Sequence, residues 1–136
     1  MNDESNSIFE STNLSDKRIL IIDDDEAVRK VLRKMLEGLS AQVEEAEDGE
    51  QGIRKYQEGI FNLIVTDMIM PCKEGIQVIQ ELRRKHPEVA IIAISGGGEG
   101  ASMDYLKWAK MLGARACLPK PIQKKDFINT VLDNLK

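Results

Sequence analysis

Short apolar runs alternate with amphipathic segments along most of the chain. Continuous apolar runs within residues 18–22, 61–67 and 89–95 have the pattern of strands buried on both faces, and residues 41–46 and 114–121 predict two weaker strands. Apolar side chains at helical spacing predict helices at residues 25–39, 48–59, 75–86, 101–113 and 124–135. Five successive strand–helix units predict an α/β fold, with a parallel sheet covered by helices on both faces.

The first residues of the chain have a different composition. Residues 1–16 are rich in Asn, Ser, Asp and Glu, which predicts a flexible N-terminal tail. Residues 17–136 carry all of the alternating pattern. A chain of 136 residues also suggests one domain. We therefore expect a single folded unit that begins at about residue 17.

Charge and composition exclude several classes of protein. The net charge of −4 argues against an electrostatic nucleic-acid binder. No apolar run approaches the roughly 20 residues of a membrane span. The polar, acidic N-terminus does not resemble a secretory signal. Cys72 and Cys117 form neither a disulfide framework nor a zinc motif. A cytoplasmic protein with no membrane or nucleic-acid partner is expected.

Polar side chains gather where the predicted strands end. In a doubly wound parallel sheet, ligands bind beyond the carboxyl ends of the strands, so the last residue of each strand is a candidate for function. The strand ends supply several carboxylates, a hydroxyl and an ammonium group: Asp23, Asp24, Asp25, Thr66, Asp67, Ser95 and Lys120.

Such a cluster of carboxylates is costly without a counter-charge. Two like charges about 4 Å apart repel by roughly 4 kcal/mol at an effective dielectric constant of about 20. A Mg²⁺ ion would offset this repulsion, because it is typically held by one or two carboxylates together with water and phosphate oxygens. A carboxylate beside Mg²⁺, Lys and Ser can act as a nucleophile and form an aspartyl-phosphate.

Four motifs in order resemble the receiver domain of bacterial response regulators. They are IIDDD at the first strand end, VTDMIMPCKEG at the third, AISG at the fourth and GARACLPKP at the fifth. The resemblance covers about residues 17–136. It implies a flavodoxin-like, doubly wound sheet of five parallel strands in the order 2-1-3-4-5, with five helices.

The resemblance also implies a role for each matching residue. Asp67 would accept the phosphoryl group, Lys120 would contact Asp67 and then the phosphoryl oxygens, and Ser95 would donate its hydroxyl. Asp24 and Asp67 would bind Mg²⁺ directly, Asp23 would act mostly through water, and the backbone carbonyl of Ile69 would complete the coordination.

Partners follow from the same resemblance. The phosphoryl donor would be a sensor histidine kinase or a histidine phosphotransfer protein, and the output would be a contact with a downstream protein. Val28 and Val31, on the first helix, could face the donor. The Lys120–Pro121 peptide bond is expected to be cis, which essentially requires proline.

Two places depart from the family pattern. Cys117 occupies the position on the fifth strand where the family usually has Tyr or Phe, and cysteine is too small to swing inward as that aromatic side chain does. The loop at residues 96–100, GGGEG, is unusually rich in glycine, and we expect it to be mobile.

Several other polar and aromatic side chains have a simpler structural explanation. Asp25 is expected to cap the first helix rather than bind metal. The first helix should have a solvated basic face, and His86 should be a solvated residue at the end of the helix predicted at 75–86. Of two stripes on the helix at 101–113, one should pack on the sheet and the other could meet a partner. The basic face comprises Arg29, Lys30, Arg33 and Lys34, and the stripes are Tyr105, Trp108 and Leu112, and Leu106 and Ala109.

Two other functions would use parts of the same pattern. A haloacid-dehalogenase-type phosphatase would use Asp23 as nucleophile and Asp25 as acid–base, but it leaves Asp67 without a role. A receiver-like interaction module that is never phosphorylated would explain Cys117. Because the chain ends directly after the fifth helix, a stand-alone receiver is expected, although a receiver excised from a longer protein has the same sequence.

Overall fold

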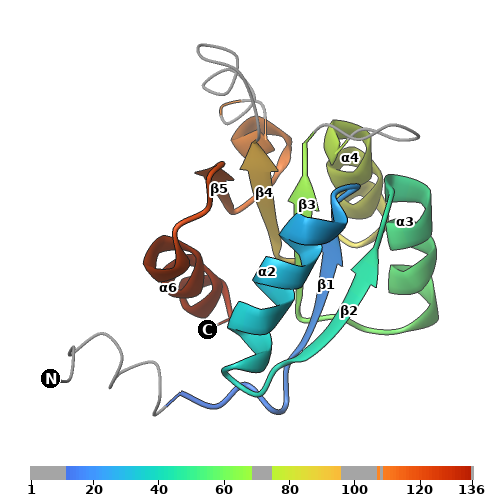
Figure 1. The fold of residues 1–136 in the computed structure, drawn as a ribbon. Coiled ribbons are helices and arrows are strands. Elements are labelled where there is room, and N and C mark those ends of the chain that lie inside the picture. The colour runs from blue at the N-terminus through green and yellow to red at the C-terminus, as the bar shows by residue number, and fades with distance from the viewer. Residues whose placement is uncertain (1–11, 69–74, 96–106, 108, 136) are drawn as a thin grey trace, which may run out of the picture.

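A five-stranded parallel sheet forms the centre of the protein (Figure 1). The structure, a computed structural model, describes residues 12–68, 75–95, 107 and 109–135. The strand order is β2-β1-β3-β4-β5, as predicted. The strands are β1 (Arg18–Ile22), β2 (Gln42–Ala46), β3 (Leu63–Asp67), β4 (Ile91–Ser95) and β5 (Ala116–Pro119).

Helices cover both faces of this sheet. They include α2 (Glu26–Glu37), α3 (Gly49–Glu58), α4 (Gly75–Lys85) and α6 (Lys124–Asn134). Residues 107 and 109–112 are also helical. Figure 1 shows α2 and α6 on one side of the sheet and α3 and α4 on the other. The predicted doubly wound α/β fold is therefore confirmed.

Alternate residues of each central strand pack into two separate cores. Ile19 and Ile21 of β1 face the core that includes residues of α2 and α6. Leu20 and Ile22 face the core that includes residues of α3 and α4. All four side chains are fully buried. Because neighbouring side chains of a strand point to opposite faces, only a continuous apolar run can fill both cores.

Two local features fix the helices that follow β1 and β2. Asp25 caps α2, its carboxylate accepting hydrogen bonds from the backbone N–H groups of Ala27 and Val28, which confirms the predicted cap. Gly52 of α3 lies so close to β1 that a Cβ there would come within 2.3 Å of Ile22 Cδ1. The close approach of α3 to β1 therefore requires glycine at this position.

One side chain that precedes residue 17 packs on the core. Leu14 lies within the segment predicted to be a flexible tail, yet it is 6% exposed and belongs to the core beside α2 and α6. Its backbone N–H donates a 2.7 Å hydrogen bond to the carbonyl of Leu39.

Among the described residues, no helix combines the length and apolar character needed to cross a membrane.

Candidate functional site

The predicted acidic residues meet at the carboxyl edge of the sheet. Oxygen atoms of the Asp23, Asp24 and Asp67 carboxylates all lie within 4.8 Å of one another. Asp23 directly follows β1 and Asp67 ends β3, and these two strands are neighbours in the sheet. Asp23 and Asp67 are buried, at 1% and 5% exposure, whereas Asp24 is exposed.

Lys120, just beyond β5, points into this cluster. Its Nζ lies 3.3 Å from Asp67 Oδ2 and 3.4 Å from Asp23 Oδ2. Its backbone N–H donates a 2.9 Å hydrogen bond to the carbonyl of Ser95, which joins this residue to the end of β4. The peptide bond from Lys120 to Pro121 is cis, as predicted.

The pKa values of Asp23 and Lys120 are both raised, but for different reasons. Burial of Asp23 raises the pKa of its carboxyl group, and the Asp67 charge adds to the effect, which the hydrogen bond from Asp25 and the charge of Lys120 only partly oppose. Burial lowers the pKa of Lys120, but the Asp67 and Asp23 carboxylates outweigh it and leave the pKa raised. Lys120 is therefore held in its charged form.

Two buried oxygen atoms in this region make no hydrogen bond. Within the described part of the chain, Asp23 Oδ2 and Ser95 Oγ are the buried side-chain oxygens that make no hydrogen bond, although Asp23 Oδ2 is ion-paired with Lys120. A buried oxygen that lacks a partner carries a desolvation cost. A cation beside Asp23 and a phosphoryl oxygen beside Ser95 would each remove that cost. The residues present therefore fit Mg²⁺ together with a phosphoryl group.

Several sequence predictions fall outside the described residues. They concern the backbone carbonyl of Ile69, the glycine-rich segment at 96–100, Cys72, and Tyr105, Leu106 and Trp108 of the stripes. Of the described stripe residues, Ala109 is buried in the core beside α3 and α4, and Leu112, from the other stripe, is half-buried against the same core. The choice between the two stripes therefore stays a prediction. Cys117 is half-buried against the same core, and burial raises the pKa of its thiol.

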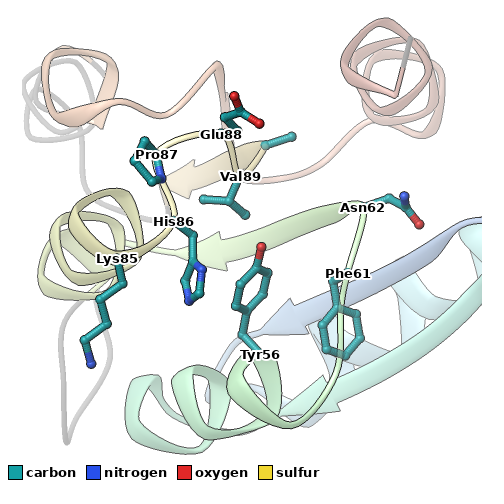
Figure 2. Close-up of a pocket in the computed structure, with 9 residues that line it drawn as sticks. Tyr56, Phe61, Asn62, Lys85, His86, Pro87, Glu88 and Val89 are labelled. Atoms are coloured by element: carbon teal, nitrogen blue, oxygen red, sulfur yellow. The ribbon is translucent and has the colours of Figure 1, made fainter.

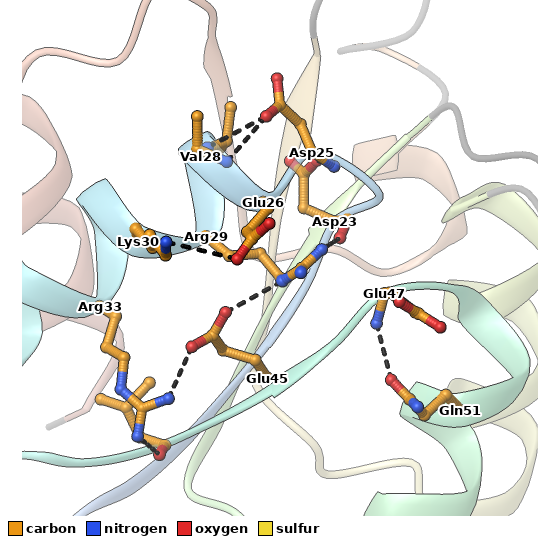
Figure 3. A network of polar contacts seen from close by, with 12 residues as sticks. Asp23, Asp25, Glu26, Val28, Arg29, Lys30, Arg33, Glu45, Glu47 and Gln51 are labelled. Carbon is orange, nitrogen blue, oxygen red and sulfur yellow. Dashed lines mark hydrogen bonds and ion pairs between the residues drawn. The ribbon is translucent and has the colours of Figure 1, made fainter.

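The basic face predicted for the first helix is only partly solvated. Lys30 is exposed, with 67% of its side chain accessible. Arg29 is only 13% accessible, because its guanidinium lies between the Glu45 carboxylate and the backbone carbonyl of Asp23 (Figure 3). The prediction of a solvated Arg29 was therefore wrong. Helical spacing alone could not reveal the partner of Arg29, since Glu45 lies on a separate element, strand β2.

A groove with apolar walls adjoins the cluster. It encloses about 260 Å³ between one face of α2 and the segment after β5, and Lys120 is among the residues that line it. Val31 is 49% exposed on its wall. The lining residues are Ala27, Val28, Val31, Leu32, Lys120, Pro121 and Ile122.

A larger hollow lies at the opposite end of the sheet. It encloses about 600 Å³ beside the start of β3 and β4, and Figure 2 shows the rings of Tyr56, Phe61 and His86 around it. The His86 ring centroid is 4.7 Å from that of Tyr56, so His86 is half-buried against an aromatic ring rather than solvated, and α4 ends one residue earlier, at Lys85. None of the acids of the cluster lines this hollow.

The comparisons with known proteins agree with this geometry. The family model for the response regulator receiver domain matches residues 19–132. The chain belongs to the response regulator receiver domain family. In this family the acidic pocket binds Mg²⁺, and the cluster of Asp23, Asp24 and Asp67 fits that use. The family assignment replaces the haloacid-dehalogenase interpretation.

Relatives of this receiver domain include proteins of different architecture. It is 31% identical to the chemotaxis protein CheY of Halobacterium salinarum, over 88% of this chain and 97% of the relative. It is 35% identical to the transcriptional regulatory protein ResD of Bacillus subtilis, over 65% of this chain but 36% of the relative. It is 31% identical to the sensor kinase CckA of Brucella abortus, over 87% of this chain and 12% of that protein.

Solved receiver structures have the same fold. A receiver domain protein from Clostridium thermocellum superposes with a TM-score of 0.81 at 26% identity, covering 88% of this chain and 94% of that chain. A CheY-like receiver from Methanospirillum hungatei gives a TM-score of 0.80 at 29% identity, covering 88% and 93%. The resemblance to receiver domains predicted from four motifs is confirmed.

Proposed function

We propose that this receiver domain accepts a phosphoryl group from a phosphohistidine onto Asp67 in a Mg²⁺-dependent reaction. The observation that carries the proposal is the position of the Asp67 carboxylate. It is buried at the end of β3, faces Lys120 Nζ at 3.3 Å, and shares its surroundings with Asp23 and Asp24. Of the three acids, Asp67 is the one that is itself part of a strand, since Asp23 and Asp24 lie in the turn after β1.

The transfer is a single displacement at phosphorus. A carboxylate oxygen of Asp67 attacks, a P–O bond forms, and the P–N bond to the donor histidine breaks. The electron pair of that bond remains on the imidazole, which takes up a proton and leaves neutral. Such transfers depend on positioning and on neutralising the phosphoryl charge, rather than on covalent assistance.

Three groups of this chain would supply that positioning. Asp23 and Asp24 would hold Mg²⁺ with Asp67, and the bound ion would neutralise charge on the phosphoryl oxygens. Lys120 would contact another of these oxygens, since its charge is already held beside Asp67. The hydroxyl of Ser95, which makes no hydrogen bond with the described residues, would donate to a third.

The apolar groove is the surface we assign to the phosphoryl donor. It is continuous with Lys120, and its α2 wall exposes Val31 beside the half-buried Val28. A helix of a histidine kinase or histidine phosphotransfer protein that fills the groove would bring its phosphohistidine toward Asp67. The relatives include both response regulators and a sensor kinase, which is consistent with a partner of this kind.

The phosphorylated domain would then signal through a protein contact or pass the phosphoryl group on in a relay. Cys117, where the family usually has an aromatic residue, offers no large side chain to move between two positions. We therefore place the output in surfaces other than an aromatic switch on β5. Slow hydrolysis of its own aspartyl-phosphate is the one enzymatic activity that we expect.

Intact-mass spectrometry tests the proposal. The protein is incubated with a small acyl-phosphate, with Mg²⁺ or with a chelator, beside Asp67→Asn. We expect one added phosphoryl group on the wild type in Mg²⁺ and none in the other samples. A folded wild-type protein that gains no phosphoryl group, from the acyl-phosphate or from a phosphorylated histidine partner, would instead favour the unphosphorylated interaction module.

A further inference from the structure

Arg29 of α2 connects a neighbouring strand to the acidic turn after β1. Its Nε lies 2.9 Å from Glu45 Oε1 on β2, and its Nη1 donates a 2.6 Å hydrogen bond to the backbone carbonyl of Asp23 (Figure 3). The two side chains of the ion pair are 13% and 22% exposed. A planar guanidinium suits this arrangement, because its fixed fork of donors can hold two acceptors at once.

The carbonyl that Arg29 holds belongs to the peptide that joins Asp23 to Asp24. The rest of the turn is fixed on other sides. Asp23 donates its backbone N–H to Ala46 at 3.1 Å, and its carboxylate accepts the N–H of Asp25 at 2.8 Å. The Asp24 carboxylate is exposed and makes no hydrogen bond with the described residues. Its direction therefore depends on the backbone of the turn.

We propose that Arg29 is a positioning residue for Mg²⁺ binding. Its hydrogen bond fixes the Asp23–Asp24 peptide and so aims the Asp24 carboxylate at the cation. The inference rests on the proposed function, since it concerns the same acidic site. Mg²⁺ requires nearly ideal octahedral geometry, so a small rotation of this peptide weakens its binding. Groups that orient metal ligands without touching the metal commonly affect affinity strongly.

The positive charge of Arg29 weakens Mg²⁺ binding, whereas its proposed positioning role strengthens it. Removing Arg29 therefore separates the two effects. Arg29→Gln leaves Glu45 with one fewer cation, so the surroundings of the site become more negative. Electrostatics alone would then strengthen the binding of a divalent cation. Loss of positioning would weaken it. The double variant Arg29→Gln/Glu45→Gln removes both charges and leaves the local net charge unchanged.

Arg33 provides a matched control on the same helix. Its Nη1 lies 2.6 Å from Glu45 Oε2, the other oxygen of the carboxylate that Arg29 contacts. Its remaining contacts are with Glu37 and the carbonyl of Val43. Arg33→Gln therefore removes a comparable ion pair between α2 and β2 and leaves the hydrogen bond to the Asp23 carbonyl in place.

Isothermal titration calorimetry of the full chain with Mg²⁺ is the test. Arg29→Gln and the double variant should each bind Mg²⁺ about fivefold or more weakly than the wild type, and Arg33→Gln within about twofold. Phosphoryl uptake by Arg29→Gln should recover at high Mg²⁺ concentration, because the defect lies in metal affinity. Circular dichroism checks that each variant is folded.

Two results would overturn the inference. One is Mg²⁺ binding by both variants that lack Arg29 within twofold of Arg33→Gln. The other is tighter binding by Arg29→Gln, which would mean that charge alone acts. In either case the wild type still binds Mg²⁺, so the proposed function stands. A wild type that fails to bind Mg²⁺ would instead contradict the proposed metal site itself, and this inference with it.

Discussion

Asp23 is buried beside a second acid, Asp67, so ionisation of its carboxyl group is unfavourable in the folded protein. Its carboxylate is 1% exposed, one of its oxygens makes no hydrogen bond with the part of the chain that the structure describes, and its pKa is raised above the ordinary value by burial and then by Asp67. Ionisation of this group therefore opposes folding when no cation is bound. Stability is lost as the pH rises from the unfolded pKa, near 4, through the raised folded pKa.

Asp23→Asn should accordingly stabilise the metal-free protein at pH 7. We expect a gain of about 1 kcal/mol, equivalent to a rise of about 3 °C in Tm for a chain of this length. The gain should vanish as the pH falls to about 4, where the native carboxyl group is already neutral. Thermal unfolding in a chelator, followed across this pH range, measures it.

The same titration contains its own control. Mg²⁺ should raise the Tm of the wild type and change that of Asp23→Asn much less, because the variant lacks one of the acids around the cation. A metal-free Asp23→Asn protein that unfolds at a lower temperature than the wild type at pH 7 would contradict this account of Asp23.

At the scale of elements, α3 packs closely against β1. A Cβ on Gly52 would lie 2.3 Å from Cδ1 and 2.8 Å from Cγ1 of Ile22, a fully buried side chain at the end of β1. The next residue is Asp23, so crowding at Ile22 acts directly beside the acidic turn. Tight packing on this face of the sheet and geometry of the site are therefore coupled.

Gly52→Ala should destabilise the protein by about 1–3 kcal/mol, since the buried side chain of Ile22 has to move. Gly38→Ala is the matched control. Gly38 ends α2 with a φ of −60°, and a Cβ there would meet backbone oxygens only at 3.4 Å. That variant should be neutral or slightly stabilising. Chemical denaturation of both variants measures the difference, and equal stability would contradict the packing argument.

Sequence patterns predicted the elements better than the contacts between them. Continuous apolar runs identified the buried strands, and strand ends identified Asp23, Asp67, Ser95 and Lys120, because both follow from the geometry of a parallel sheet. The contact between Arg29 and Glu45 was not predictable in this way. It depends on the register of β2 against β1, which brings Glu45 opposite Ile21.

At the scale of the whole molecule, the two ends of the sheet carry different features. The acidic cluster and the apolar groove lie at the carboxyl ends of the strands, and the aromatic hollow lies at the other end (Figure 2). Leu14 shows the limit of composition as a guide to the domain boundary, since a polar segment can still contribute one buried side chain to the core. The boundary at residue 17 stays a prediction.

A change in the groove should affect the protein donor and leave a small donor unaffected. Val31→Gln should slow phosphoryl transfer from a phosphorylated histidine partner by about threefold to tenfold, because an apolar contact is lost. Uptake from a small acyl-phosphate should not change. Ile60→Gln, at the other end of the sheet and 82% exposed in the native protein, is the control. Equal rates for both variants with the protein donor would exclude the groove as the docking surface.

The central claim is that Asp67 carries the phosphoryl group, and locating the modified residue tests it most directly. The protein is phosphorylated in Mg²⁺, the aspartyl-phosphate is reduced with borohydride, and the peptides are sequenced by mass spectrometry. We predict that Asp67 alone is converted to homoserine. Conversion at Asp23 instead would restore the phosphatase-like assignment of the nucleophile, and a stable phosphoryl group on Ser95 would contradict an aspartyl-phosphate altogether.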